Sequence, residues 1–227
     1  DPRGIAIDPV GGKIYWTDLW FDKIQRANLD GTNVEYLVFL ADTEQFTNAY
    51  GIAIDASRGK IYWADPDTGK IQRANLNGTN VENLVTRDMA GLIFSPVGIA
   101  ADTVGGKIYW TDIGSRKIQR ANLDGTEVED LVTEPDVPSD IAVDAVREKI
   151  YWTDGSHIRR MNFNGTNVED FATGLSGRDI AVDAVGGQIY WIGSRKIRRA
   201  NLDGTNIEDF FVAQTGNLDS LVVDGVG

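Results

Sequence analysis

Apolar runs and Ile/Tyr/Trp-rich segments follow one another in the same order five times along the chain. Each repeat opens with a short apolar run, such as GIAI at 4–7, and continues through a Pro/Gly-rich turn to KIYWTD at 13–18 or its equivalent. A third segment, such as KIQRANL at 23–29, alternates apolar and polar positions. Such alternation is typical of a half-exposed strand, whereas a short continuous apolar run fits a strand buried on both faces. The pattern therefore predicts strands, and no segment shows a long helical period.

The third segment ends in DGT or NGT in every repeat. This predicts a tight hairpin in which both central residues have positive φ. A fourth segment, such as NVEYLV at 33–38, carries Glu and predicts an outer strand whose charge protects an exposed sheet edge. Each repeat is thus predicted to be a four-stranded antiparallel meander, with strands named A to D from the buried to the exposed side.

The repeat length indicates the architecture. The Tyr of the second segment recurs after 47, 47, 42 and 39 residues. Four strands in a period near forty are typical of one β-propeller blade, and such repeats must stack to bury their apolar faces. We therefore predict an all-β fold, a single β-propeller domain over 1–227. Its repeats are expected at about 3–47, 48–95, 96–138, 139–177 and 178–217.

The YWTD segment, the preceding GIAID and the following RANLDGT resemble the class B repeats of the low-density lipoprotein receptor, also called YWTD repeats. The resemblance covers nearly the whole chain and is specific, because three segments recur in order with constant spacing. The second repeat departs at Ala64 and the fifth at Ile192-Gly193. The resemblance implies that the motif Asp residues join one blade to the next: Asp18, Asp65, Asp112 and Asp154. The motif Trp residues are expected to fill the spaces between blades: Trp16, Trp63, Trp110, Trp152 and Trp191.

The two ends of the chain pose a counting problem. A sixth apolar run, LDSLVVD at 218–224, predicts an extra inner strand without strands B to D. The resemblance implies six blades, whereas the chain holds five and this one strand. Residues beyond 1–227 could complete the sixth blade, the ring could close with five blades, or a second chain could supply the missing strands. In each case we expect 218–224 to be paired, because an exposed strand edge recruits partners.

Composition limits the partners and the compartment. The net charge of −12 argues against nucleic acid and against anionic membrane surfaces, because phosphate groups require a basic surface. The chain has no Cys, no apolar run long enough to insert in a bilayer and no signal peptide, although its start at Asp1 is compatible with removal of a leader. From the resemblance we expect a secreted or extracellular protein.

Catalytic chemistry has little support in the sequence. His157 is the only His and is expected in a surface turn, and the inner segments lack the Glu, Asn and Asp set of a metal-dependent propeller hydrolase. The Asp that ends each A strand is expected to accept backbone N–H bonds in the A–B turn rather than to hold a cation. We expect no catalytic residue, metal site or cofactor. Asn77 and Asn164 match glycosylation acceptors, but sister repeats carry Asp there, so turn geometry explains both.

Positions that break the repeat suggest a ligand-binding face. Apolar residues occupy the first B–C turn and the first two D–A connections, and both kinds of connection emerge on the same side of a propeller. The expected face consists of Leu19, Trp20, Phe21, Phe46, Tyr50, Met89 and Phe94. Packing of these loops on each other into a local core explains the same residues equally well.

These features favour a non-catalytic binding or scaffold propeller that presents loops on one face to a protein, peptide or glycan. One alternative is a structural assembly or fibre subunit that self-associates through the incomplete blade at 218–224. Another is a propeller-type metal-dependent hydrolase or lyase. Nucleic acid and membrane insertion are not expected.

Overall fold

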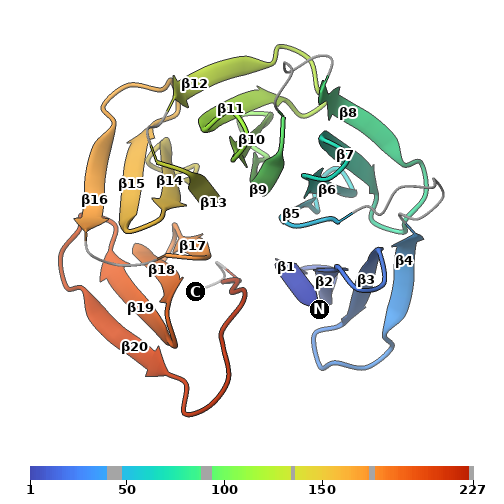
Figure 1. The fold of residues 1–227 in the computed structure, drawn as a ribbon. Helices are drawn as coiled ribbons and strands as arrows, with labels where there is room; N and C mark the ends of the chain where they lie inside the picture. Colours follow the sequence, from blue (N-terminus) through green and yellow to red (C-terminus); the bar gives the residue numbers. More distant parts are fainter. Residues whose placement is uncertain (40–47, 88–93, 134–135, 174–176, 225–227) are drawn as a thin grey trace.

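Five four-stranded sheets surround a central channel in the computed structural model, which describes residues 1–39, 48–87, 94–133, 136–173 and 177–224 (Figure 1). Blade 1 holds β1 (Pro2–Asp8), β2 (Lys13–Asp18), β3 (Lys23–Asn28) and β4 (Glu35–Phe39). Blade 2 holds β5 (Ile52–Asp55), β6 (Lys60–Asp65), β7 (Lys70–Asn75) and β8 (Glu82–Thr86). Blade 3 holds β9 (Pro96–Asp102), β10 (Lys107–Asp112), β11 (Lys117–Asn122) and β12 (Glu129–Thr133). Blade 4 holds β13 (Pro138–Asp144), β14 (Lys149–Asp154), β15 (His157–Asn162) and β16 (Glu169–Thr173). Blade 5 holds β17 (Ile180–Asp183), β18 (Gln188–Gly193), β19 (Lys196–Asn201) and β20 (Glu208–Val212). The described strands pair antiparallel in chain order, which confirms the predicted all-β propeller of four-stranded blades.

Alternation within the YWTD segment explains how the blades pack. Successive side chains on a strand point to opposite faces, so the Tyr and the Trp of one blade face different neighbours. In the core between blades 2 and 3, Tyr62 of blade 2 packs with Trp110 of blade 3. The same Tyr-to-Trp arrangement recurs in the other three cores between successive blades. Four motif Trp residues are buried there, as predicted: Trp63, Trp110, Trp152 and Trp191.

The Tyr face of blade 5 and the Trp face of blade 1 have no such partner. Trp16 and Tyr190 are only half-buried, and Phe211 of β20 is exposed. The C-terminal segment 213–224 passes between these two blades (Figure 1). The expectation that every motif Trp lies between two blades therefore fails for Trp16, because none of the five described blades packs on its side.

Residues 219–224 line the channel wall, but the stretch 218–224 does not form a β-strand. The expected extra inner strand is thus wrong as a β-strand, because the described residues offer it no partner strand for a ladder. Hydrogen bonds to Asp179 hold the segment to blade 5: the backbone N–H of Leu221 donates to Asp179 Oδ2 at 2.9 Å, and the Ser220 side chain bonds the same carboxylate. The segment therefore occupies the inner position of a sixth blade.

The turns agree only in part with the prediction. The Asp that ends each A strand accepts a backbone N–H in the A–B turn of all five blades, as from Gly11 to Asp8 Oδ1 at 2.8 Å, which confirms its expected role. In the DGT turn the prediction of two positive φ angles at the central residues is wrong. Gly31 has φ 80, but the second such residue is Asn33 at φ 54, because the C–D connection is longer than a two-residue hairpin. Asn77 and Asn164 accept the N–H and hydroxyl of the Thr two residues on, as Asp30 does.

Among the described residues, the motif Thr links neighbouring blades, whereas the hydrogen bonds of the motif Asp residues lie within their own blades and the connections that lead into them. Thr17 Oγ1 accepts the N–H of Gly4 and donates to the carbonyl of Tyr50, both at 2.8 Å. Thr111 makes the same pair of bonds between blades 3 and 4. Blade 2 carries Ala64 instead, and there Gly51 N donates directly to Val97 O at 2.8 Å. The direct bond compensates for the missing hydroxyl.

A repeated Arg forms a second link. Arg120 pairs through Nε with Glu129 of its own blade and donates through a terminal nitrogen to the carbonyl of Phe163 in blade 4 at 2.6 Å. Arg26, Arg73 and Arg160 bond the following blade in the same way. Charge-assisted bonds of this kind are stronger than neutral ones, so they add directional contacts to the apolar cores.

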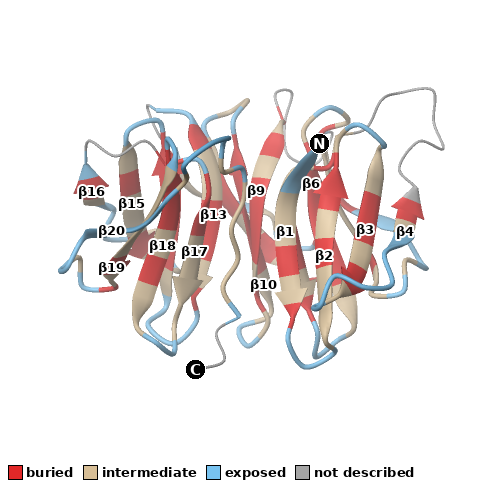
Figure 2. Ribbon diagram, turned by 90° about the horizontal axis from the view of Figure 1, so that it is seen from below, coloured by how far each residue is buried: buried red, intermediate tan, exposed pale blue. Residues whose placement is uncertain are grey.

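The strand directions place the connections on two opposite faces (Figure 2). The B–C turns and D–A connections form one face, which we call the loop face, and the A–B and C–D turns form the other, which we call the turn face. Figure 2 shows the N-terminus at the loop face, whereas the C-terminal segment runs along the wall toward the turn face. Among the described residues, the structure contains no helix of sufficient length and apolarity for a membrane span.

Candidate functional site on the loop face

The first B–C turn carries two exposed aromatic side chains. Trp20 and Phe21 are 79% and 62% exposed. The motif residue Asp18 accepts the N–H of Trp20 at 3.1 Å, and Asp22 adopts φ 48 before β3 begins. These constraints fix the turn backbone while the ring side chains remain in solvent. Large exposed aromatics on a rigid support commonly mark an interaction surface.

A third aromatic joins this pair on blade 1. Lys23 Nζ lies 4.1 Å from the ring centroid of Tyr36 and 5.3 Å from that of Phe21, so one cation contacts both rings. We call Trp20, Phe21 and Tyr36 the aromatic patch. Sequence reasoning missed Tyr36, although a signal was present: sister D strands carry Asn or Asp at this position, such as Asn83.

The other expected face residues lie in different environments. Leu19 is half-buried, and Tyr50 is half-buried on the channel wall. Phe94 is buried and packs edge-to-face on Trp110, with ring centroids 6.3 Å apart, so it cannot contact a ligand on the surface. Phe46 and Met89 lie outside the described residues. Of the expected face, the structure brings together Trp20 and Phe21.

The central channel is lined by the inner strands. Its cavity volume is about 530 Å³, and inner strands of all five blades contribute to the wall together with 219–224. Most of the wall is Ile, Ala and Val, as the sequence indicates. Carboxyl groups interrupt it, among them Asp140 and Asp179, which occupy the position that is Gly in blades 1 to 3.

The Asp residues in the channel replace backbone contacts that the glycines permit. A Cβ on Gly51 would lie 2.5 Å from the carbonyl oxygen of Val97, so the inner strands of blades 2 and 3 touch at this level. At the next positions around the ring, the Asp140 carboxylate instead accepts the N–H of Ile180 at 2.9 Å. Burial raises the pKa of Asp140, and the neighbouring Asp179 charge raises it further; burial also raises the pKa of Asp179. The two carboxyl groups therefore favour sharing a proton.

Comparison with known proteins agrees with this architecture. The family of the low-density lipoprotein receptor repeat class B matches residues 12–56, 59–103 and 106–145, which is more than half of the chain. The chain belongs to this family. No curated protein sequence matches it significantly.

Solved structures share the fold at low identity. A chain in the crystal structure of the nidogen/laminin complex is 23% identical with a TM-score of 0.86, and the match covers 97% of this chain and 84% of that one. Virginiamycin B lyase from Staphylococcus aureus is 21% identical with a TM-score of 0.73, over 97% and 73% of the two chains. A gluconolactonase from Xanthomonas campestris is 21% identical with a TM-score of 0.78, over 96% and 78%. These similarities concern the fold, not a shared activity.

Proposed function

We propose that this YWTD propeller is a non-catalytic, extracellular protein-binding module that recognises a protein or peptide through the aromatic patch on its loop face. The observation that carries the proposal is the exposure of Trp20 and Phe21 in a turn whose backbone is held by Asp18. Both rings are mostly exposed, so packing within the described part of the chain does not explain them. Aromatic anchors on a rigid scaffold lose little conformational entropy on binding.

The family and the fold support a protein partner. The nidogen/laminin structure is a complex between proteins, and the matched chain in that complex has the same fold as this chain. The lyase and lactonase folds are less similar by TM-score. In the channel, Asp140 and Asp179 each accept a backbone N–H, which assigns them a role in holding the wall. Lys23 next to Phe21 and Tyr36 favours a segment that combines an apolar side chain with a carboxylate.

Peptides selected from a phage-displayed random library against the immobilised propeller provide a test. We expect the dissociation constants of the selected peptides to rise at least about tenfold for Trp20→Ser or Phe21→Ser, which is the loss expected for a central aromatic anchor. Val104→Ser is the matched control, since Val104 is 88% exposed in an A–B turn on the turn face. Peptides that tolerate both loop-face variants but lose affinity for Val104→Ser would contradict the proposal.

A second candidate function is self-assembly through the opening between blades 5 and 1. Phe210 and Phe211 of blade 5 and Leu29 of blade 1 are exposed on the sides where other blades have neighbours. Apolar faces of this kind favour association, and a contact between unlike faces propagates unless rotation closes it. Light scattering over a concentration series tests this: assembly predicts a mass that rises with concentration and falls for Phe211→Asp. A constant monomeric mass excludes it.

A further inference from the structure

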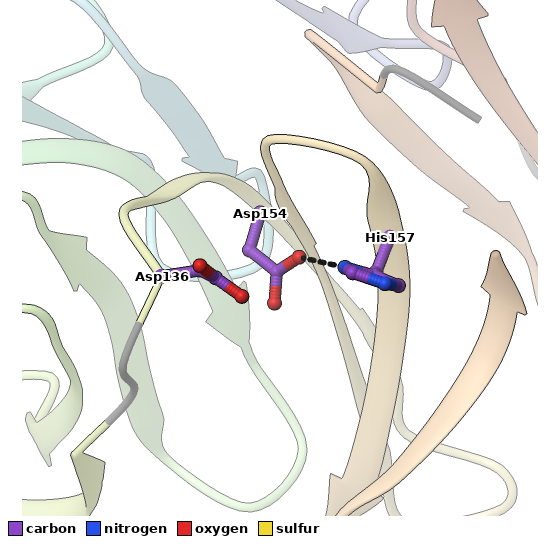
Figure 3. A group of neighbouring side chains, drawn as sticks. All are labelled: Asp136, Asp154 and His157. Carbon is purple, nitrogen blue, oxygen red and sulfur yellow. Dashed lines mark hydrogen bonds and ion pairs between the residues drawn. The ribbon is translucent and has the colours of Figure 1, made fainter. Parts of the chain in front are cut away.

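Blade 4 brings an imidazole and two carboxyl groups together on the loop face. Asp136 comes from the connection that leads to β13, Asp154 ends β14, and His157 begins β15 (Figure 3). Asp154 is buried, His157 is half-buried and Asp136 is exposed, so the group is open to solvent on one side. One candidate donor atom from each residue lies within 4.8 Å of the others.

The short B–C turn of blade 4 accounts for the unusual surroundings of Asp154. In blade 3 the equivalent Asp112 accepts the N–H groups of Gly114 and Ser115 at 2.9 and 3.3 Å. Blade 4 has only Gly155 and Ser156 between the strands, and the contacts of Asp154 are with side chains: His157 Nδ1 lies 3.1 Å from Oδ1, and Arg159 Nε lies 2.8 Å from Oδ2. Oδ2 is buried and makes no hydrogen bond to the residues that the structure describes, so its contact with Arg159 is an unaligned charge pair.

Within the described part of the chain, Asp154 contacts two side chains, His157 and Arg159, but accepts no backbone hydrogen bond. A buried carboxylate is normally stabilised by several hydrogen bonds or by a metal ion. A cation placed between Asp136, Asp154 and His157 would give the buried carboxylate a further partner without disturbing the strands, because Asp136 precedes a strand, Asp154 ends one and His157 begins one.

We propose that Asp136, Asp154 and His157 form a divalent transition-metal site of the zinc or manganese class. One imidazole nitrogen with two carboxylate oxygens suits such ions, which bind these donors at about 2.0–2.2 Å. Donors around one ion are then separated by at most about 4.4 Å, twice that bond length. Asp154 Oδ1 and His157 Nδ1 already satisfy this limit at 3.1 Å. The exposed Asp136 need move by only a few tenths of an ångström to satisfy it too.

The three residues supply half or more of a coordination shell, so water or a partner's side chain would complete it. Arg159 beside Asp154 opposes the ion electrostatically, which sets the affinity below that of a closed structural zinc site. The site lies on the loop face but over blade 4, away from the aromatic patch on blade 1. It is therefore independent of the proposed peptide recognition.

Isothermal titration of the tag-free chain with zinc chloride tests the site, with manganese electron paramagnetic resonance as a second readout. We expect one ion per chain and at least about a tenfold weaker affinity for Asp136→Asn and His157→Lys, since each removes one of three donors. His157→Lys carries the residue found at the same place in blade 3, Lys117, so the strand should be retained. The control Asp67→Asn removes a carboxylate from the loop face of blade 2 and should bind zinc as the wild type does.

The outcomes separate a built site from general attraction to an acidic surface. No saturable binding, or one-to-one binding that survives both Asp136→Asn and His157→Lys, would overturn the proposal. An equal loss in Asp67→Asn would also overturn it, because that result indicates attraction by the net charge alone. Melting temperatures without metal confirm that the variants are folded. Zinc should raise the melting temperature of the wild type but not that of Asp136→Asn or His157→Lys.

Discussion

Asp179 accepts a hydrogen bond from the backbone N–H of Leu221 at 2.9 Å, and Asp140 accepts the corresponding bond from Ile180 at the same distance. The first bond joins blade 5 to the C-terminal segment, and the second joins blade 4 to blade 5. The segment thus sits beside blade 5 as β17 sits beside blade 4. Its position is set by a side chain of the preceding blade, because it has no strand partner of its own to define a register.

The Asp179 bond should hold the C-terminal segment against the ring. We expect Asp179→Ala to speed amide hydrogen exchange throughout 218–224, because the segment loses its link to blade 5. Asp179→Asn retains an acceptor oxygen and should preserve most of the protection. Exchange that is equally slow in all three proteins would show that apolar contacts alone fix the segment.

Motif Trp residues should differ in importance according to whether a blade covers them. Trp110→Ala should lower the free energy of unfolding by about 3–5 kcal/mol, the usual loss for a buried large aromatic. Trp16→Ala should cost less, since its ring faces the opening, and Trp20→Ala should cost least. Urea unfolding measures all three. Equal losses for Trp16 and Trp110 would mean that Trp16 is covered in solution, for example by a second chain.

The repeated Arg provides a matched pair for the contribution of the inter-blade bond. Arg120→Ala leaves the carbonyl of Phe163 without its donor, and an unsatisfied group of this kind costs about 1–3 kcal/mol. Arg199 makes the same ion pair with Glu208 but has no following blade to bond. Arg199→Ala should therefore shift the urea midpoint much less. Similar shifts for both variants would assign the effect to the ion pairs within each blade.

The carboxyl pair in the channel should make stability depend on pH. The pKa of Asp140 is raised in the folded state, so folding favours the protonated form and the charged form opposes it. Asp140→Asn keeps an acceptor for Ile180 and removes the charge, so it should raise the melting temperature by a few degrees at neutral pH. The difference should shrink as the pH falls toward the ordinary Asp value of 3.8. A gap that stays constant with pH would indicate that charge is not its cause.

The sequence by itself determined the blade. Period-two alternation, Pro/Gly turns and the Asp that ends each A strand act over a few residues, so they specify four strands in every copy wherever that copy lies in the ring. The burial of Trp63, Trp110, Trp152 and Trp191 could be predicted for the same reason, since each repeat needs a neighbour. The exposed aromatics Trp20 and Phe21 could be found because they break the repeat.

Only the tertiary structure decided what depends on the position of a blade relative to others. Trp16 has the same local sequence as Trp110 but lies next to the opening, and Phe94, which looks like a loop residue, packs on Trp110 in the core between blades 2 and 3. Tyr36 meets Phe21 through Lys23, and Asp136 meets Asp154 and His157, across connections whose paths no periodicity specifies. Local pattern fixes strands and turns, whereas these contacts depend on ring curvature and on how each loop crosses the face.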